Sequence, residues 1–170
     1  MAEGLDASSI TDDDIYGGRF RETSFGPIPC RWPISLLSDC AEVQTGVTKG
    51  RTIDPADSIE LPYLRVANVQ DGYLDLSEIK QITVRRSEVA RFSLKVGDVV
   101  LTEGGDFDKL GRGFLWNGEV FGCLHQNHIF AVRPNQAVLT PEFLAYLTQK
   151  PLRKEIFSIG CASNHALGVH

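Results

Sequence analysis

One segment, residues 97–113, constrains the fold more than any other part of the sequence. It begins with a Gly-Asp turn, continues as the apolar run Val99-Val100-Leu101, and ends in a loop dense in glycine and charge. The glycines permit positive φ and close backbone approach, while the charged residues between them contribute little to a core. These loop residues are Gly104, Gly105, Asp106, Asp108, Lys109, Gly111, Arg112 and Gly113. The segment therefore predicts a buried strand that leads into a specifically ordered loop.

Two hairpins are predicted from alternation and turn residues. Residues 63–69 alternate between two faces, and the turn at 70–72 leads into a second strand at 73–76. Residues 114–121 contain two short apolar runs around Asn117-Gly118, the signature of a type I′ hairpin turn.

Single strands and helices are predicted elsewhere. Residues 81–84 and 129–132 have β character, and residues 36–41 and 87–92 each predict a short helix. A further helix begins at residues 140–142, where a capping threonine precedes a proline and an acid. Its expected buried stripe is Phe143, Leu144 and Leu147.

These elements predict an α+β fold: a single domain with a mixed, mostly antiparallel β-sheet and helices near the C-terminus. The chain has 170 residues and is 42% hydrophobic, which suffices for one ordinary core. We expect residues 1–24 to be a mobile acidic tail, residues 25–163 to form the domain, and residues 164–170 to be a truncated or disordered terminus.

Charge and composition limit the function classes. The net charge is −5, which disfavours a nucleic-acid binder, but residues 1–24 carry −4 of it and the remainder is nearly neutral. A nearly neutral domain can still present one basic face. No apolar run approaches the roughly 20 residues of a membrane span, and no signal sequence is evident, so we expect a cytoplasmic protein without membrane contact. Four widely spaced cysteines then predict free thiols.

Three stretches carry a family resemblance: residues 62–76, residues 97–106 and His125-Gln126-Asn127-His128. They resemble the target-recognition domain of the DNA specificity subunit of type I restriction-modification systems. The similarity extends from about Pro27 to about Ser163, roughly four fifths of the chain. A full family member holds two such domains and long helices, so we expect this chain to be a half-sized subunit, a gene fragment or an expressed domain.

The resemblance implies sequence-specific recognition of double-stranded DNA without catalysis and without a cofactor. Each target-recognition domain of the family reads part of a split site, while modification (methyltransferase) subunits and a restriction subunit act on the DNA. A domain of this charge would bind DNA weakly alone, so these partner subunits would supply much of the electrostatic attraction.

DNA readout requires forked donors and acceptors on surface loops, with basic groups on phosphate. The candidates are Gln44, Thr45, Thr48, Lys49, Arg51, Arg65, Asn68, Lys109, Arg112, Gln126 and Asn127. A second group is expected to shape the loops: Gly97, Asp98, Glu103, Gly104, Gly105, Asp106, Gly111, Gly113, His125 and His128. For Asn127 and His128 we favour a structural role, and each other candidate could equally be a solvated surface residue.

Other chemistries have weaker support. Asp98, Glu103, Asp106 and Asp108 could hold Mg²⁺ in a nuclease, but turn-capping explains them as well. Residues 123–128 offer a cysteine and two histidines for zinc, but strand alternation sends His128 to the opposite side. No phosphate-binding loop or methyltransferase motif occurs. The main alternative is a protein-interaction or remnant module that keeps the fold without reading DNA.

Overall fold

The structure is a computed structural model, and it describes residues 19–23, 26–103 and 111–149. The chain divides into two compact units, Met1–Ser35 and Leu36–His170. In the first unit, β1 (Phe20–Thr23) pairs antiparallel with β2 (Gly26–Pro29). The strand β1 lies within residues 1–24, the segment expected to be a mobile acidic tail. Proline is tolerated in β2 because a two-stranded pair consists of edge strands.

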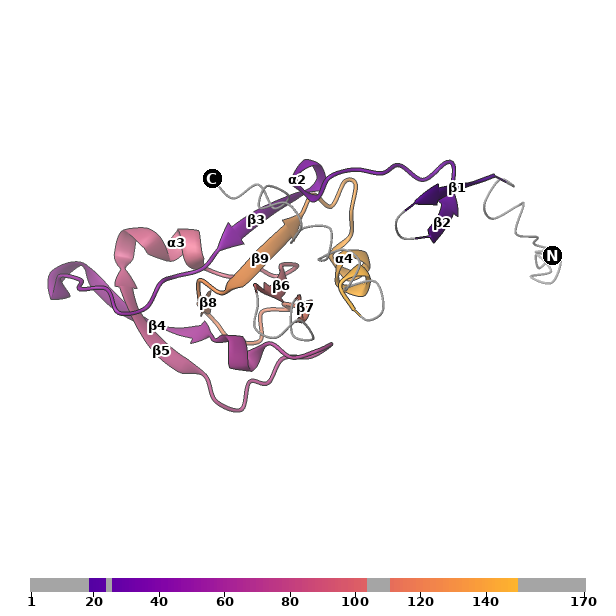
Figure 1. The fold of residues 1–170 in the computed structure, drawn as a ribbon. Helices are drawn as coiled ribbons and strands as arrows, with labels where there is room; N and C mark the ends of the chain where they lie inside the picture. The colour runs from indigo at the N-terminus through magenta and orange to yellow at the C-terminus, as the bar shows by residue number, and fades with distance from the viewer. Residues whose placement is uncertain (1–18, 24–25, 104–110, 150–170) are drawn as a thin grey trace, which may run out of the picture. The chain divides into compact units, whose positions relative to one another are not determined.

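In the second unit, the larger sheet has four strands in the order β3-β9-β6-β7, all antiparallel (Figure 1). These strands are β3 (Ala41–Thr45), β9 (Ile129–Pro134), β6 (Val99–Thr102) and β7 (Gly113–Leu115). Gly113 is required for the β6–β7 pairing, because a Cβ at this position would lie 2.2 Å from the backbone oxygen of Val100.

Both faces of β6 are covered, which explains its continuous apolar sequence. Val99 and Leu101 pack in one cluster with Leu144 of the helix α4 (Pro141–Leu147). Val100 packs in a second cluster with Trp116 and other buried side chains. The predicted buried strand is therefore confirmed.

A second sheet of three strands has the order β5-β4-β8. β4 (Ser58–Leu64) pairs antiparallel with β5 (Lys80–Arg85) and parallel with the short β8 (Leu124–His125). Its core contains Val47 and Phe92 together with strand residues from β4, β5 and β8. The expected α+β class with mostly antiparallel pairing is confirmed, although the strands form separate sheets.

The short helices are α2 (Leu37–Cys40), η2 (Pro55–Asp57), η3 (Val66–Asn68), η4 (Arg86–Glu88) and α3 (Val89–Phe92). They confirm the helices predicted near residues 36–41 and 87–92. The start of α4 is also confirmed, because the Thr140 hydroxyl accepts a hydrogen bond from the Phe143 amide at 3.3 Å. The predicted buried stripe was partly wrong, since Phe143 is 46% exposed while Leu144 and Ala145 are buried.

The hairpin predicted at residues 114–121 was wrong, and the one predicted at residues 63–76 was correct only for its turn and one antiparallel bridge. β4 ends at Leu64 and pairs with β5, while the turn at residues 70–72 closes a single antiparallel bridge between Val69 and Leu74. At Asn117 a type I′ turn would need positive φ, but every positive-φ residue in the described part of the chain is glycine. The Glu119 carboxylate accepts the Asn117 backbone N–H at 3.1 Å, so local side-chain bonding replaces the expected cross-strand pair.

Within the described residues, no helix has the length and apolar character needed to span a membrane. Cys30, Cys40 and Cys123 are free cysteines, and Cys161 lies outside the described residues.

Candidate nucleic-acid interface

Two candidate segments about 80 residues apart in sequence meet in the structure. Val47, in the loop after β3, forms a parallel β-bridge with Gln126 in the turn between β8 and β9. The Val47 N–H donates to the His125 carbonyl at 2.8 Å, and the Asn127 N–H donates to the Val47 carbonyl at 3.0 Å. We define residues 44–51 and 125–128 together as the paired loops.

Gly46 allows this close approach. A Cβ at Gly46 would lie 2.1 Å from the His125 carbonyl oxygen and 2.5 Å from that of Gln126. Contacts this short to backbone atoms exclude any side chain without a shift of the main chain. The glycine therefore fixes how near the two loops come to each other.

His125 holds the paired loops to the rest of the unit. Its side chain is fully buried, with Nδ1 3.0 Å from the Phe92 carbonyl and Nε2 3.3 Å from the Gln44 carbonyl. Burial lowers the pKa of His125 and outweighs the opposing effect of these two carbonyls. A neutral imidazole donates a hydrogen bond from one nitrogen only, so only one of these two carbonyls accepts a hydrogen bond from His125. The expected structural role of His125 agrees with this geometry.

The cationic candidates in the first loop lie at its surface. Lys49 is exposed and places its Nζ 5.4 Å from the centre of the Tyr63 ring. Arg51 is partly exposed and bonds Glu88 of η4 through Nη1 at 2.8 Å. Thr48 is exposed, whereas Gln44 and Thr45 are partly buried in β3. The first of the paired loops therefore exposes Thr48 and Lys49, and Arg51 in part.

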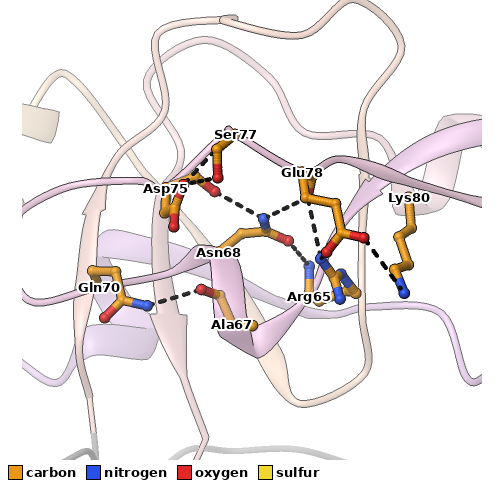
Figure 2. A network of polar contacts seen from close by, with 8 residues as sticks. All are labelled: Arg65, Ala67, Asn68, Gln70, Asp75, Ser77, Glu78 and Lys80. Atoms are coloured by element: carbon orange, nitrogen blue, oxygen red, sulfur yellow. Dashed lines mark hydrogen bonds and ion pairs between the residues drawn. The ribbon is translucent and has the colours of Figure 1, made fainter.

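Asn68 lies at the centre of a different network, shown in Figure 2. It is 3% exposed, its Oδ1 accepts the Arg65 backbone N–H, and its Nδ2 donates to the carbonyls of Asp75 and Glu78. The Arg65 guanidinium bonds the Glu78 carboxylate at 2.7 Å. This geometry uses both side chains to stabilise the irregular segment between β4 and β5, so neither is placed to reach DNA without breaking these bonds.

The flanks of the glycine-rich loop adjoin the paired loops. Glu103 accepts a bond from His128 Nδ1 at 2.8 Å, and its own backbone N–H donates to the His128 carbonyl at 3.0 Å. On the other flank, the Gly111 N–H donates to the Thr102 carbonyl, and the Arg112 carbonyl accepts from the Thr102 N–H. The rest of this loop lies outside the described residues, including Gly104, Gly105, Asp106, Asp108 and Lys109.

Asp98 and Gly97 form the turn that leads into β6. Gly97 has φ of 92°, and the Asp98 carboxylate is fully buried. Both carboxylate oxygens bond Arg133 of β9 at 2.8 Å, and one also accepts the Lys95 backbone N–H. Arg133 was not among the sequence candidates, since nothing local indicates a partner 35 residues away. Asp98 therefore anchors the turn through a forked ion pair.

The residues considered for metal binding have separate surroundings. Cys123 and His125 are buried, whereas His128 is exposed on the side of Glu103. Burial raises the pKa of Cys123 to about 12, which disfavours the thiolate that binds zinc. Across residues 19–23, 26–103 and 111–149, no three His, Cys, Asp or Glu side chains gather as metal ligands.

A group of exposed basic residues was not among the candidates predicted from the sequence. Arg85, Arg86 and Arg91 lie on the end of β5, on η4 and on α3, and all three are exposed. The signal was present in the sequence as a local excess of basic residues between positions 80 and 95.

No protein-family model matches this chain. The chain is 26% identical over 140 residues to a protein of Methanocaldococcus jannaschii named "Putative type I restriction enzyme MjaX specificity subunit". The matched region is 81% of this chain and 32% of the relative, so the chain spans about a third of that protein's length. The family resemblance carried by the sequence motifs is thus supported by an independent similarity to a type I restriction enzyme specificity subunit.

Proposed function

We propose that this chain recognises a short sequence in double-stranded DNA, as one target-recognition domain of a type I restriction-modification specificity subunit. In this role it directs partner modification (methyltransferase) and restriction subunits to their site and is not itself an enzyme. The observation that carries the proposal is the meeting of the paired loops, which joins two segments rich in polar side chains into one surface.

The chemistry of the paired loops suits base readout. Gln126 and Asn127 carry planar amides that can form two hydrogen bonds to adenine in the major groove. Their backbone N–H groups already bond the carbonyls of Leu64 and Val47, and their side chains are partly exposed. The Asn127 amide nitrogen lies 3.3 Å from His128 Nε2, a contact at the surface that it would exchange for one to adenine. Lys49 supplies a cation for phosphate on the same surface. The proposed readers are therefore held by a rigid backbone frame.

Asn68 and Arg65 are left out of the proposed surface because the fold uses their polar groups. The chain's net charge of −5 predicts weak binding to DNA alone, so the proposal includes a contribution from the modification subunits to the electrostatic attraction.

A second candidate is a protein-interaction or remnant module of the same fold. The pairing of Arg51 and Arg65 with glutamates favours it, because those guanidiniums are already neutralised within the chain. Absence of duplex binding, or binding that does not weaken with salt, would support this candidate.

The nuclease alternative has less support, since Asp98 bonds Arg133 and Glu103 bonds His128. Incubation of plasmid DNA with Mg²⁺ tests it directly. Intact plasmid would exclude the activity under those conditions, whereas cleavage that Asp106→Ala abolishes would establish it.

Selection from a randomised duplex library at low salt tests the proposed function. The chain is used with and without a modification subunit, and the retained DNA is sequenced. Enrichment of one short motif is the expected result. Retention without enrichment, or no retention in either condition, would overturn sequence recognition.

A further inference from the structure

Basic residues concentrate in one part of the second unit. Residues 80–95 contain five basic side chains and one acid, a net charge of +4 in a chain of net −5. The basic residues are Lys80, Arg85, Arg86, Arg91 and Lys95, and all five are exposed. So strong a local excess in an acidic protein needs a separate explanation.

One of these arginines, Arg85, is linked to the first of the paired loops through Glu88. The Glu88 carboxylate lies 2.8 Å from Arg51 and 3.5 Å from Arg85, so it joins the loop after β3 to η4. The bond from Arg51 is the largest of the effects that lower the pKa of Glu88 and keep it charged. In Figure 1, the loop after β3 and the helix α3 lie together at one end of the unit. We call residues 46–58 and 85–92 the basic end.

Buried contacts connect the basic end to the part of the chain that carries Gln126 and Asn127. Val47, Val84 and Phe92 share one buried cluster, which lies beneath the loop, β5 and α3. The Phe92 carbonyl also lies 3.0 Å from Nδ1 of His125, the last residue of β8 and the one before the β8–β9 turn. Buried contacts therefore connect the elements that carry these arginines to the turn that carries Gln126 and Asn127.

Charge at the basic end stays positive after its acids are counted. It holds Lys49, Arg51, Arg85, Arg86 and Arg91 against Asp54, Asp57 and Glu88, a net of +2. Four of the five cations are arginines, whose planar forks suit phosphate oxygens. Of the acids, Asp54 is engaged locally, since its side chain accepts the Ala56 backbone N–H at 2.9 Å.

We propose that the basic end binds the phosphate backbone of the same duplex whose bases the paired loops contact. This inference rests on the proposed function and adds a division of roles within it. Arg86 and Arg91 hold phosphates regardless of sequence, and Gln126 and Asn127 discriminate between bases. Phosphate is favoured over an acidic protein because the basic end is continuous with the loop that meets the readers.

Filter binding with two duplexes of equal length tests the proposal, one carrying the motif from the library selection and one unrelated. The double variant Arg86→Ala/Arg91→Ala is compared with Lys80→Ala/Lys95→Ala, which removes the same charge from exposed positions outside the basic end. We expect Arg86→Ala/Arg91→Ala to weaken binding of both duplexes by about tenfold and to reduce the salt slope by about 2. The ratio between the duplexes should not change, and the lysine variant should keep most of the parent slope.

The other possible results distinguish failure of the phosphate role from failure of the proposed function. If the parent prefers the motif and both double variants have its affinity and salt slope, the phosphate role is wrong and the proposed function stands. A parent that binds both duplexes equally would overturn the proposed function, while an arginine-specific loss would still support the phosphate role. If poly-L-glutamate of matched charge competes as well as DNA, an acidic protein partner is indicated and the proposal is overturned.

Discussion

The Asn68 side chain stabilises the connection between β4 and β5. Its amide makes three hydrogen bonds from a position only 3% exposed, and these bonds replace the strand pairing that alternation predicts there. Sequence patterns do not distinguish such an asparagine from a surface reader, because both occur in polar loops beside strands. Its burial in the structure makes the distinction.

Replacement of Asn68 by alanine should therefore destabilise the fold. The variant leaves the Arg65 N–H and the Asp75 carbonyl without their partner, while the Glu78 carbonyl keeps its bond from Arg65 Nη2. We expect the free energy of unfolding to fall by roughly 2–3 kcal/mol. Urea denaturation followed by fluorescence measures this change. Gln70→Ala is the matched control, since it removes one exposed bond to the Ala67 carbonyl and should stay within about 0.5 kcal/mol of the parent. Equal effects of the two changes would contradict the structural role of Asn68.

His125 predicts a dependence of stability on pH. Burial holds its pKa in the folded protein below the ordinary value of 6.5, so below that pH the unfolded chain binds more protons than the folded one. The free energy of unfolding should accordingly be highest above pH 6.5 and should fall as the pH drops towards the lower folded-state pKa. Urea midpoints at about pH 7.5 and 5.5 measure this difference, because carboxylates titrate little in that range.

His128, which is exposed, provides the control for His125. His125→Gln should flatten the pH dependence, even where it lowers stability at both pH values, whereas the exposed His128→Gln should retain it. A His125→Gln variant as sensitive to pH as the parent would show that another group causes the effect.

Several helices and strands were predicted correctly from local sequence patterns. β5, β6, β9 and α4 were expected from alternation, an apolar run and a capped helix start, and the structure confirms them. The hairpin at residues 114–121 failed, and the one at residues 63–76 formed only in part, because side chains of Asn68 and Glu119 supply bonds that the turn rules assign to a partner strand. The parallel pairing of β4 with β8 joins segments 60 residues apart, and no local pattern encodes it.

The close approach of the paired loops depends on the absence of a side chain at Gly46. Gly46→Ala should push the loop after β3 away from the His125 carbonyl, because the added Cβ would lie 2.1 Å from it. We expect a loss of about 3 kcal/mol in the free energy of unfolding, together with loss of DNA sequence preference. Gly50→Ala is the comparison in the same loop, where φ is 73° and no atom lies within 4 Å of the added Cβ. That variant should cost about 1–2 kcal/mol and keep the preference.

A result in which Gly46→Ala selects the same DNA motif as the parent would contradict the importance of the close loop contact. Circular dichroism of both variants establishes that each remains folded before binding is compared.

For the whole molecule, sequence motifs identified the candidate loops but not their arrangement. Residues 44–51 and 125–128 were proposed separately, and only the structure brings them together. Arg133 and the arginines of the basic end were missed, because their partners are far away in sequence or act through shared surface charge. The glycine-rich loop that dominates the sequence lies mainly outside the described residues, so its part in DNA binding stays a prediction.

Reading of DNA sequence by the paired loops is tested by repeating the library selection with Gln126→Ala/Asn127→Ala and comparing its enriched motif with that of the parent. We expect the variant to lose discrimination at one or two adjacent positions, each by about 1–3 kcal/mol, and to keep the preference elsewhere in the site. An identical motif, enriched to the same degree by the folded variant and the parent, would contradict sequence reading by the paired loops.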